Sequence, residues 1–502
     1  MTSFLTSPLT SFAERCGVHD AARQSALVRT ARLIEASGVE LVRFAWCDLH
    51  GMLRSKTLVA SAAVKAMMSG VGMVSTLLLK DSADRTAYKV FDSDGAFELP
   101  GFEFAGNVML LADPASYQQL PWASKTGWLQ CQAWHADTKP VVFDTRRVLQ
   151  AALAGLAGAG YGMTCGLEVE FHIYKIKGDS ANNQLDPMQA SWPGSAPEVA
   201  MIHPGFHMLS EQWADMADEP LRIVQHTALA LGLPLLSLEI ELGPSQVEAV
   251  FEPTDALKAA DNMVLFRSAV KQALRRAGYH ASFMCRPPFP SIMSSGWHLH
   301  QSLTDLKTSI NLFRRDSPEF GSNAQHAGYT LSELGQHYLA GLLVHAQASS
   351  PFCTATINGY DRFQPQSLAP QSAVWGHDNR GAMLRVIGGQ NDNATRIENR
   401  IGEPAANPYL YMASQIRAGM SGIRARMQAP KATDAPYDTD EARLPGSLGK
   451  ALEMLNNDLA FCADFGTDFI RYFTRVKASE VARYELAEDK AEWQRREYFN
   501  RI

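Results

Sequence analysis

The stretch ATRIENRIGEP, residues 394–404, decides the fold of this chain. In a β-strand successive side chains alternate between two faces, so Arg396, Glu398 and Arg400 lie on one face and apolar or amide side chains on the other. A single charged strand face is ordinarily solvated. Several such faces turned to the same side would instead line a charged cavity floored by a β-sheet.

Three earlier runs carry titratable side chains in the same alternating pattern. They are GLEVEFHIY (166–174) with Glu168 and Glu170, LSLEIELGPSQVEAVFEP (236–253) with Glu239, Glu241 and Glu248, and SGWHLHQSL (295–303) with His298 and His300. Taken alone, paired glutamates fit an exposed edge strand, and two histidines on one strand face are more often structural than metal-binding. Four such strands together predict the charged cavity.

Nearby segments add guanidinium groups to this set. NGYDRF supplies Arg362, and WGHDNRGAMLRV supplies Arg380 and Arg385. Carboxylates hold divalent metals through oxygen, metals bridge phosphates, and arginines bind phosphate or carboxylate oxygens in a fork. A donor set of several carboxylates with an imidazole favours Mg²⁺ or Mn²⁺ over zinc. The pattern therefore indicates phosphoryl transfer.

Other phosphate-binding and paired-glutamate enzymes fit this sequence less well. It contains no G-x-x-x-x-G-K-[ST] motif, and the glycines of residues 155–162 lie between a predicted helix and a predicted strand, which is the reverse of the Rossmann order. Paired glutamates also occur in glycosidases, but that chemistry does not need converging arginines and histidines.

The composition is that of an ordinary globular protein, with 46% hydrophobic and 20% charged residues in 502. This length predicts two domains. A net charge of −6 gives no reason to expect nucleic acid or an anionic membrane as a partner. The seven scattered cysteines form no C-x-x-C pair, and the first residues do not resemble a signal peptide, so we expect a soluble cytoplasmic protein.

Local patterns divide the chain into a small and a large domain. Residues 26–37 have helical spacing, and residues 41–58 are predicted as two strands joined by a tight turn at Gly51. A polar, proline-bearing connector at residues 134–144 precedes a predicted helix at 145–160. We predict an amino-terminal domain at residues 20–138 and a catalytic domain at 139–502. Surface loops are expected at 177–200 and 427–447, and helices from 448 onward.

Six ordered motifs resemble those of glutamine synthetases. They are GLEVEF, the GPSQVE run, SSGWHLHQSL, NGYDRFQPQSLAP, DNRGAMLRV and RIENRIGEPAANPYL, followed near the end by EWQRREYF. The resemblance implies an α+β fold, with a β-grasp amino-terminal domain and a catalytic domain built on a curved antiparallel sheet. It also implies stacked rings, such as a dodecamer, with active sites between subunits. ATP would phosphorylate the γ-carboxylate of glutamate, and an amine would attack the acyl phosphate.

The resemblance also implies a role for each matching residue, with two or three Mg²⁺ or Mn²⁺ ions in the site. One metal would be held by Glu170, Glu241 and Glu248, and another by Glu168, His298 and Glu398. Glu239 is the alternative to Glu241 at the first metal. ATP phosphates would contact His300, Arg380 and Arg385, with Arg380 also stabilising transition-state charge, and glutamate would be held by Arg362 and Arg400. Asp48 matches an aspartate that helps to deprotonate the amine. Without the other motifs, its position before Gly51 would indicate only a turn residue.

The sequence departs from ammonia-using members of the family in the region of the amine. Leu368 falls where those members carry a glutamate, and Met293 lies in a segment that is usually Asn-Gly-Ser-Gly. We expect a bulky or aromatic amine such as aniline, with pocket walls from Leu368, Met293 and Trp297, and Phe289 or Phe363 as further candidates. An alkylamine or polyamine ligase, an ammonia-using glutamine synthetase and a non-catalytic family member remain alternatives. No role is assigned to Tyr437, which lies near a tyrosine that is adenylylated in some relatives.

Overall fold

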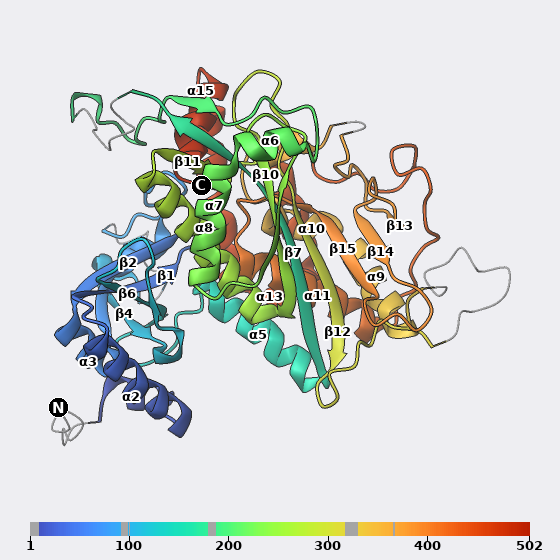
Figure 1. The fold of residues 1–502 in the computed structure, drawn as a ribbon. Helices are drawn as coiled ribbons and strands as arrows, with labels where there is room; N and C mark the ends of the chain where they lie inside the picture. Colours follow the sequence, from blue (N-terminus) through green and yellow to red (C-terminus); the bar gives the residue numbers. More distant parts are fainter. Residues whose placement is uncertain (1–9, 92–98, 100, 179–186, 317–329, 365–366) are drawn as a thin grey trace. The chain divides into compact units, whose positions relative to one another are not determined.

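The computed structural model describes residues 10–91, 99, 101–178, 187–316, 330–364 and 367–502 (Figure 1). Contacts within the chain define two compact units. The first comprises Met1–Arg147 with Ala230–Gly232, and the second comprises Val148–Leu229 with Leu233–Ile502. The domain boundary between residues 138 and 139 remains a prediction.

The amino-terminal unit is built on a mixed six-stranded sheet. Strand order is β2-β1-β6-β4-β3, with β5 paired to β6; β1 runs parallel to β6 and antiparallel to β2. Gly51, with φ of 74°, allows the tight turn between β1 and β2. The predicted β-grasp start is confirmed. The elements are α1 (Phe12–Arg15), α2 (Ala21–Ala36), β1 (Leu41–Cys47), β2 (Leu53–Val59), α3 (Ala60–Ser69), β3 (Val71–Val74), β4 (Asn107–Ala112), β5 (Gln118–Gln119) and β6 (Thr126–Trp134).

The second unit contains the predicted antiparallel sheet. In the described residues its nine strands follow the order β13-β14-β15-β12-β7-β10-β9, with β8 and β11 also paired to β7, and among these pairs only β13/β14 is parallel. In Figure 1 the long strands β7 and β12 cross the middle of this sheet side by side. The strands are β7 (Tyr161–Ile176), β8 (Val199–Met201), β9 (Leu235–Ile240), β10 (Gln246–Asp255), β11 (Tyr279–Ser282), β12 (Trp297–Asp305), β13 (Trp375–His377), β14 (Leu384–Ile387) and β15 (Arg396–Gly402).

Helices α8 (Ala256–Arg276) and α11 (Pro408–Ala425) pack on the apolar face of this sheet. Phe266 of α8 packs edge-on against Phe171 of β7 and Phe251 of β10, and Tyr411 of α11 packs against Trp297 of β12. These contacts bury one member of each alternating pair and leave the titratable side chains for the other face. The helices are α5 (Thr145–Gly158), α6 (Glu211–Met216), α7 (Asp218–Ala230), α8 (Ala256–Arg276), α9 (Glu333–Val344), α10 (Ala346–Cys353), α11 (Pro408–Ala425), α12 (Leu448–Asn457), α13 (Leu459–Phe465), α14 (Thr467–Glu485) and α15 (Lys490–Gln494).

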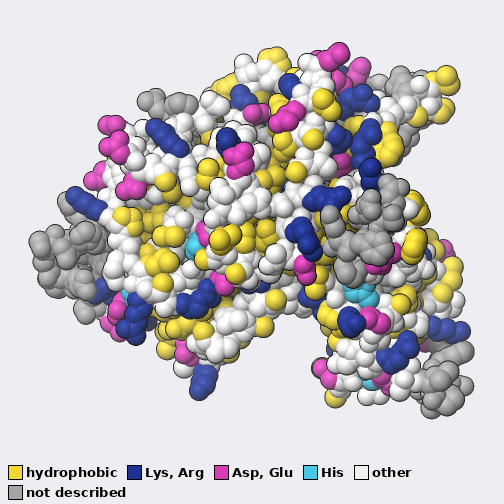
Figure 2. Space-filling view, turned by 180° about the vertical axis from the view of Figure 1, so that it is seen from behind, with side chains coloured by type: hydrophobic (Ala, Val, Ile, Leu, Met, Phe, Trp, Pro, Cys, Tyr) yellow, Lys and Arg dark blue, Asp and Glu magenta, His cyan; other side chains and the backbone are white. Residues whose placement is uncertain are grey.

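The loops and the surface follow the sequence pattern. Residues 427–447 contain no helix and no paired strand beyond an isolated bridge at Arg443, and helices begin again at Leu448, both as predicted. None of the helices in the described ranges is both long enough and apolar enough to span a bilayer. On the face in Figure 2, basic and acidic side chains are interspersed, which fits the small net charge of the chain.

Candidate active site

Cross-strand register brings the predicted charged faces together. Glu248 of β10 pairs directly with Glu170 of β7, and Glu168 of β7 pairs directly with His298 of β12. Directly paired residues in an antiparallel sheet project from the same face. On β15, Glu398 pairs with His300 of β12, so residues from four strands converge on one side of the sheet.

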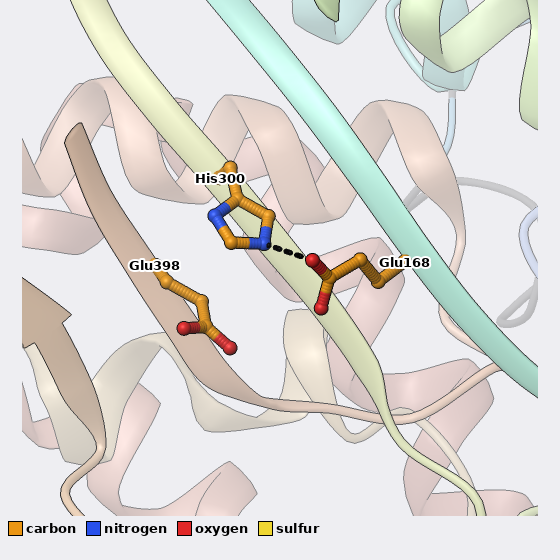
Figure 3. A group of neighbouring side chains, drawn as sticks. All are labelled: Glu168, His300 and Glu398. Carbon is orange, nitrogen blue, oxygen red and sulfur yellow. Dashed lines mark ion pairs between the residues drawn. The ribbon is translucent and has the colours of Figure 1, made fainter. Parts of the chain in front are cut away.

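Glu168 lies at the centre of this cluster. Its carboxylate is 2.9 Å from Nε2 of His300 and 3.3 Å from Nδ1 of His298. Figure 3 shows Glu168, His300 and Glu398 pointing toward one another from three neighbouring strands. The ligand-capable atoms of these three residues all lie within 4.8 Å of one another, and the same holds for Glu168, Glu248 and His298. Two overlapping groups suitable for cations therefore share Glu168.

Glu398 is fully buried and is bound by arginines on both sides. Arg385 Nη1 lies 2.9 Å from its Oε2, and Arg400 Nη1 bonds its Oε1. Arg385 also pairs with Asp378. His298 Nδ1 is 3.7 Å from Glu398 Oε1, so the predicted set of Glu168, His298 and Glu398 is close together. The fixed charges of two arginines allow this carboxylate to stay ionised without solvent.

Glu170, Glu241 and Glu248 form the second predicted set. Burial and the nearby charge of Glu241 raise the pKa of Glu170 to about 7. Burial and the surrounding carboxylates, chiefly Glu170, raise the pKa of Glu248 to about 10, and burial raises the pKa of Glu241. Carboxylates this close share protons when no cation compensates them. Glu239, directly paired with Glu248 across β9 and β10, adds to the repulsion.

The donor atoms of the cluster fit a divalent cation. Oε1 of Glu248 and Nε2 of His298 are buried and have no hydrogen-bond partner among the described residues. Burial and the charge of Arg400 lower the pKa of His298 to about 4, so its imidazole is neutral near pH 7, as a metal ligand must be. A bound cation would satisfy these atoms and remove the carboxylate repulsion.

Gln246 holds the Glu170 carboxylate in place, a role that the sequence interpretation missed. Its Nε2 lies 3.0 Å from Glu170 Oε2 and 3.1 Å from Ser295 Oγ, while its Oε1 accepts the Gly243 N–H at 2.8 Å. The Gly296 N–H also donates to Glu170 Oε2, at 2.8 Å. The available signal was the glutamine within GPSQVE, two residues before Glu248.

The remaining predicted arginines occupy different environments. Arg362 is buried, and its Nη1 donates to the backbone carbonyl oxygens of Arg400 and Gly402 at 2.8 and 3.3 Å. A Cβ at Gly296 would lie 2.6 Å from Arg362 Nη2, so this guanidinium packs directly against a glycine. Arg380 is exposed, in the turn between β13 and β14. The structure thus places Arg362 beside Arg400 on the charged side, and Arg380 at the surface.

Asp48 lies in the amino-terminal unit as a buried turn residue. Its Oδ1 accepts the backbone N–H groups of His50 and Met52, both at 3.0 Å, and its Oδ2 pairs with Arg54 Nε at 2.8 Å. Burial opposes ionisation, but the charges of Arg54 and His50 outweigh it and lower the pKa of Asp48. A carboxylate stabilised as an anion in this way is a weak base, and the role of Asp48 in deprotonating the amine remains a prediction.

The expected amine-pocket residues do not share one environment. Trp297 is fully buried against Tyr411, with ring centroids 5.0 Å apart, and its place in the amine pocket remains a prediction. Met293 packs on Gly243, and Leu368 is 59% exposed. The other two candidates each contact further aromatic rings. Phe289 packs between Tyr174 and Phe499, and Phe363 packs against Tyr360.

A curved antiparallel sheet that gathers carboxylates, imidazoles and guanidiniums on one face defines the class, an enzyme of the glutamine synthetase fold. Comparisons with known proteins agree. The family profile "Glutamine synthetase, catalytic domain" matches residues 142–498. The chain belongs to this family of carbon–nitrogen ligases, which generally use ATP and divalent metal ions.

Individual relatives cover almost the whole chain. A gamma-glutamylanilide synthase from Acinetobacter sp is 38% identical over 484 residues, covering 93% of this chain and 94% of the relative. The gamma-glutamylethanolamide synthetase GlnA4 from Streptomyces coelicolor is 28% identical, with 94% and 95% covered. The solved structure "Apo GmaS without ligand" superposes with a TM-score of 0.72 at 24% identity, covering 93% and 98%, which shows the shared fold.

Proposed function

We propose that this protein joins the γ-carboxylate of glutamate to a bulky or aromatic amine such as aniline, with ATP as cosubstrate and γ-glutamyl phosphate as intermediate. The observation that carries the proposal is the convergence of Glu168, Glu248, His298 and Glu398 from four strands on one face of the sheet. The 38% identity to a gamma-glutamylanilide synthase supports the class of amine.

The charged residues would divide by chemistry into metal-binding carboxylates with an imidazole and anion-binding basic side chains. Glu170, Glu241 and Glu248 would hold one Mg²⁺ or Mn²⁺, and Glu168, His298 and Glu398 another. The cations would neutralise phosphate charge during phosphoryl transfer.

Anionic substrates would be held by basic side chains that lie among these carboxylates, since Arg385 and Arg400 bond Glu398 and His300 bonds Glu168. Arg362 and Arg400 lie close together and would bind the carboxylates of glutamate. Arg385, already fixed by Glu398, and His300 would contact the phosphates of ATP, and exposed Arg380 would reach the same phosphates from the turn after β13. Arginines fixed before the reaction stabilise transition-state charge without reorganising.

The choice of an aromatic amine rests on the demand for a base. An alkylamine is protonated near pH 7 and must lose a proton before it attacks, whereas an aromatic amine is neutral because its lone pair is delocalised into the ring. Leu368 stands where ammonia-using relatives carry a glutamate, and the Asp48 carboxylate is held as an anion within its own turn. Both features fit a nucleophile that arrives without its extra proton.

An alkylamine ligase is the second candidate, supported by the 28% identity to a gamma-glutamylethanolamide synthetase. A non-catalytic role fits less well, because all six proposed metal ligands and the nearby arginines are retained. We also propose that the chain assembles into rings, such as a dodecamer, with active sites between subunits. Light scattering of the purified protein would measure that assembly.

The test is an amine panel with mass detection of the γ-glutamyl product. Purified protein would be incubated with ATP, Mg²⁺, glutamate and one of aniline, ethylamine, ethanolamine, putrescine or ammonia. We expect the highest kcat/KM with aniline. Efficient use of ammonia with none of the other amines would refute the proposal, and the absence of glutamate-dependent ADP release with every amine would refute ligase activity altogether.

A further inference from the structure

The segment 427–447 is hydrogen-bonded to strand β13 and to the residues just before it. Near its start, Trp375 Nε1 donates to Pro430 O at 2.9 Å, and the Thr433 N–H donates to Trp375 O at 2.9 Å. Near its end, the Leu444 N–H donates to Gln371 O at 2.9 Å. Anchors on both sides fix the position of the residues between them, including Tyr437.

The ring of Tyr437 packs on the turn that carries Arg380. A Cβ at Gly381 would lie 2.8 Å from Pro436 Cγ and 3.1 Å from Tyr437 Cε2, so this close approach requires the absence of a side chain at Gly381. The same turn is held by Asn379, whose Nδ2 donates to Thr433 O at 3.2 Å. Tyr437 is therefore half-buried over the connection between β13 and β14.

The hydroxyl of Tyr437 reaches the backbone beside Leu368. It donates to Ala369 O at 3.3 Å, and the Leu368 backbone also bonds to it. Leu368 has φ of 57°, in the left-handed region that a branched side chain rarely adopts. Such a conformation persists only when neighbouring contacts determine it, and the Tyr437 hydroxyl supplies one of them.

Tyr437 also lies near the residues proposed to bind glutamate. Burial raises its pKa, while the charges of Arg400 and Arg362 oppose the rise, so both guanidiniums act on the phenol. The phenol keeps its proton near pH 7 and remains a hydrogen-bond donor. Tyr437 therefore contacts the Leu368–Ala369 backbone and the Arg380 turn, and it lies close enough to Arg400 and Arg362 to feel their charges.

We propose that Tyr437 determines which amine is used, by forming one wall of the amine site beside Leu368 and by holding the Leu368 backbone in place. This inference rests on the proposed function. Its ring offers an apolar and π-rich surface next to the arginines, which suits an aryl group better than the hydrated ammonium ion. Tyr437 is a positioning and specificity residue and takes no part in proton transfer.

Two variants separate the hydroxyl from the ring. Tyr437→Phe removes the bond to Ala369 and should raise KM for aniline about threefold to tenfold. Tyr437→Ala removes the wall and should lower the ratio of kcat/KM for aniline to that for ammonia by at least about tenfold. KM for glutamate and for ATP should stay within about twofold of wild type in Tyr437→Phe. Tyr484→Phe, on α14, is the matched control and should change none of these values.

Amide hydrogen exchange of residues 367–369 tests the same contact without turnover. Exchange there should be faster in Tyr437→Phe than in wild type and unchanged in Tyr484→Phe. Unchanged exchange in Tyr437→Phe would overturn the inference. So would a ratio of kcat/KM for aniline to that for ammonia within about twofold of wild type in both Tyr437→Phe and Tyr437→Ala. An equal rise of KM for aniline, glutamate and ATP would also overturn it. If the wild-type protein uses no amine but exchange is still faster in Tyr437→Phe, the proposed function is refuted. The hydrogen bond between the Tyr437 hydroxyl and the backbone beside Leu368 would still be established.

Discussion

Replacing Glu248 by Gln should have opposite effects on the metal-free and the metal-bound protein. Glu248 is 8% exposed, and one of its oxygens has no hydrogen-bond partner among the described residues. Glutamine has nearly the same shape and cannot ionise. Without metal, the substitution removes a group that is costly to ionise, and with metal it removes a ligand.

The size of the first effect follows from the shifted pKa. The pKa of Glu248 rises from 4.5 to about 10 because of burial and the neighbouring carboxylates. A raised carboxyl pKa means that the folded state keeps a proton that the unfolded chain releases, so stability falls as pH rises from 4.5 toward 10. At pH 7 this costs about 3 kcal/mol of unfolding free energy. The Gln variant should therefore be more stable than wild type in EDTA. The difference in unfolding free energy between the two proteins should grow from pH 5 to pH 8.

Urea unfolding at pH 5, 7 and 8, with EDTA or with Mg²⁺, measures both effects. Wild type should gain stability with Mg²⁺, the Gln variant should gain little, and ligase activity should fall at least about 100-fold. Glu252→Gln, an exposed position on the same strand β10, is the control and should behave as wild type. The reasoning fails if Glu248→Gln is less stable than wild type in EDTA at pH 8, or if Mg²⁺ stabilises both proteins equally.

Three further predictions concern neighbouring residues. Glu398→Ala should abolish both ligase activity and the thermal stabilisation by metal. It should also cost about 3–5 kcal/mol of unfolding free energy in urea titrations, because Arg385 and Arg400 lose their buried partner. If the variant keeps its activity and its stabilisation by metal, the site is misplaced. Gln246→Leu should weaken Mn²⁺ binding about 10-fold to 100-fold in calorimetry, because Glu170 loses one of its two donors, and an unchanged affinity would contradict the supporting role. Leu368→Glu should increase the use of ammonia relative to aniline in competition assays, whereas an unchanged ratio would remove Leu368 from the amine site.

The local pattern of the sequence predicted which residues share a strand face. Alternation is a property of the extended backbone itself. The sequence alone therefore placed Glu168 and Glu170 on one face of their strand, and His298 and His300 on one face of theirs, without knowledge of the partner strands. Repetition of charged faces on four strands then indicated one cavity. The ordered motifs gave the family, and with it the curved sheet.

Tertiary structure alone decided the pairing and burial of these groups. The register that sets Glu248 opposite Glu170 depends on strands 78 positions apart, and the binding of Glu398 by Arg385 depends on the pairing of β14 with β15. The sequence could not show that the Asp48 carboxylate binds the backbone of its own turn, or that Trp297 is enclosed by the core. A sequence specifies which kinds of interaction each side chain can form. The energy of a buried charge depends on its neighbours, and only folding brings these together.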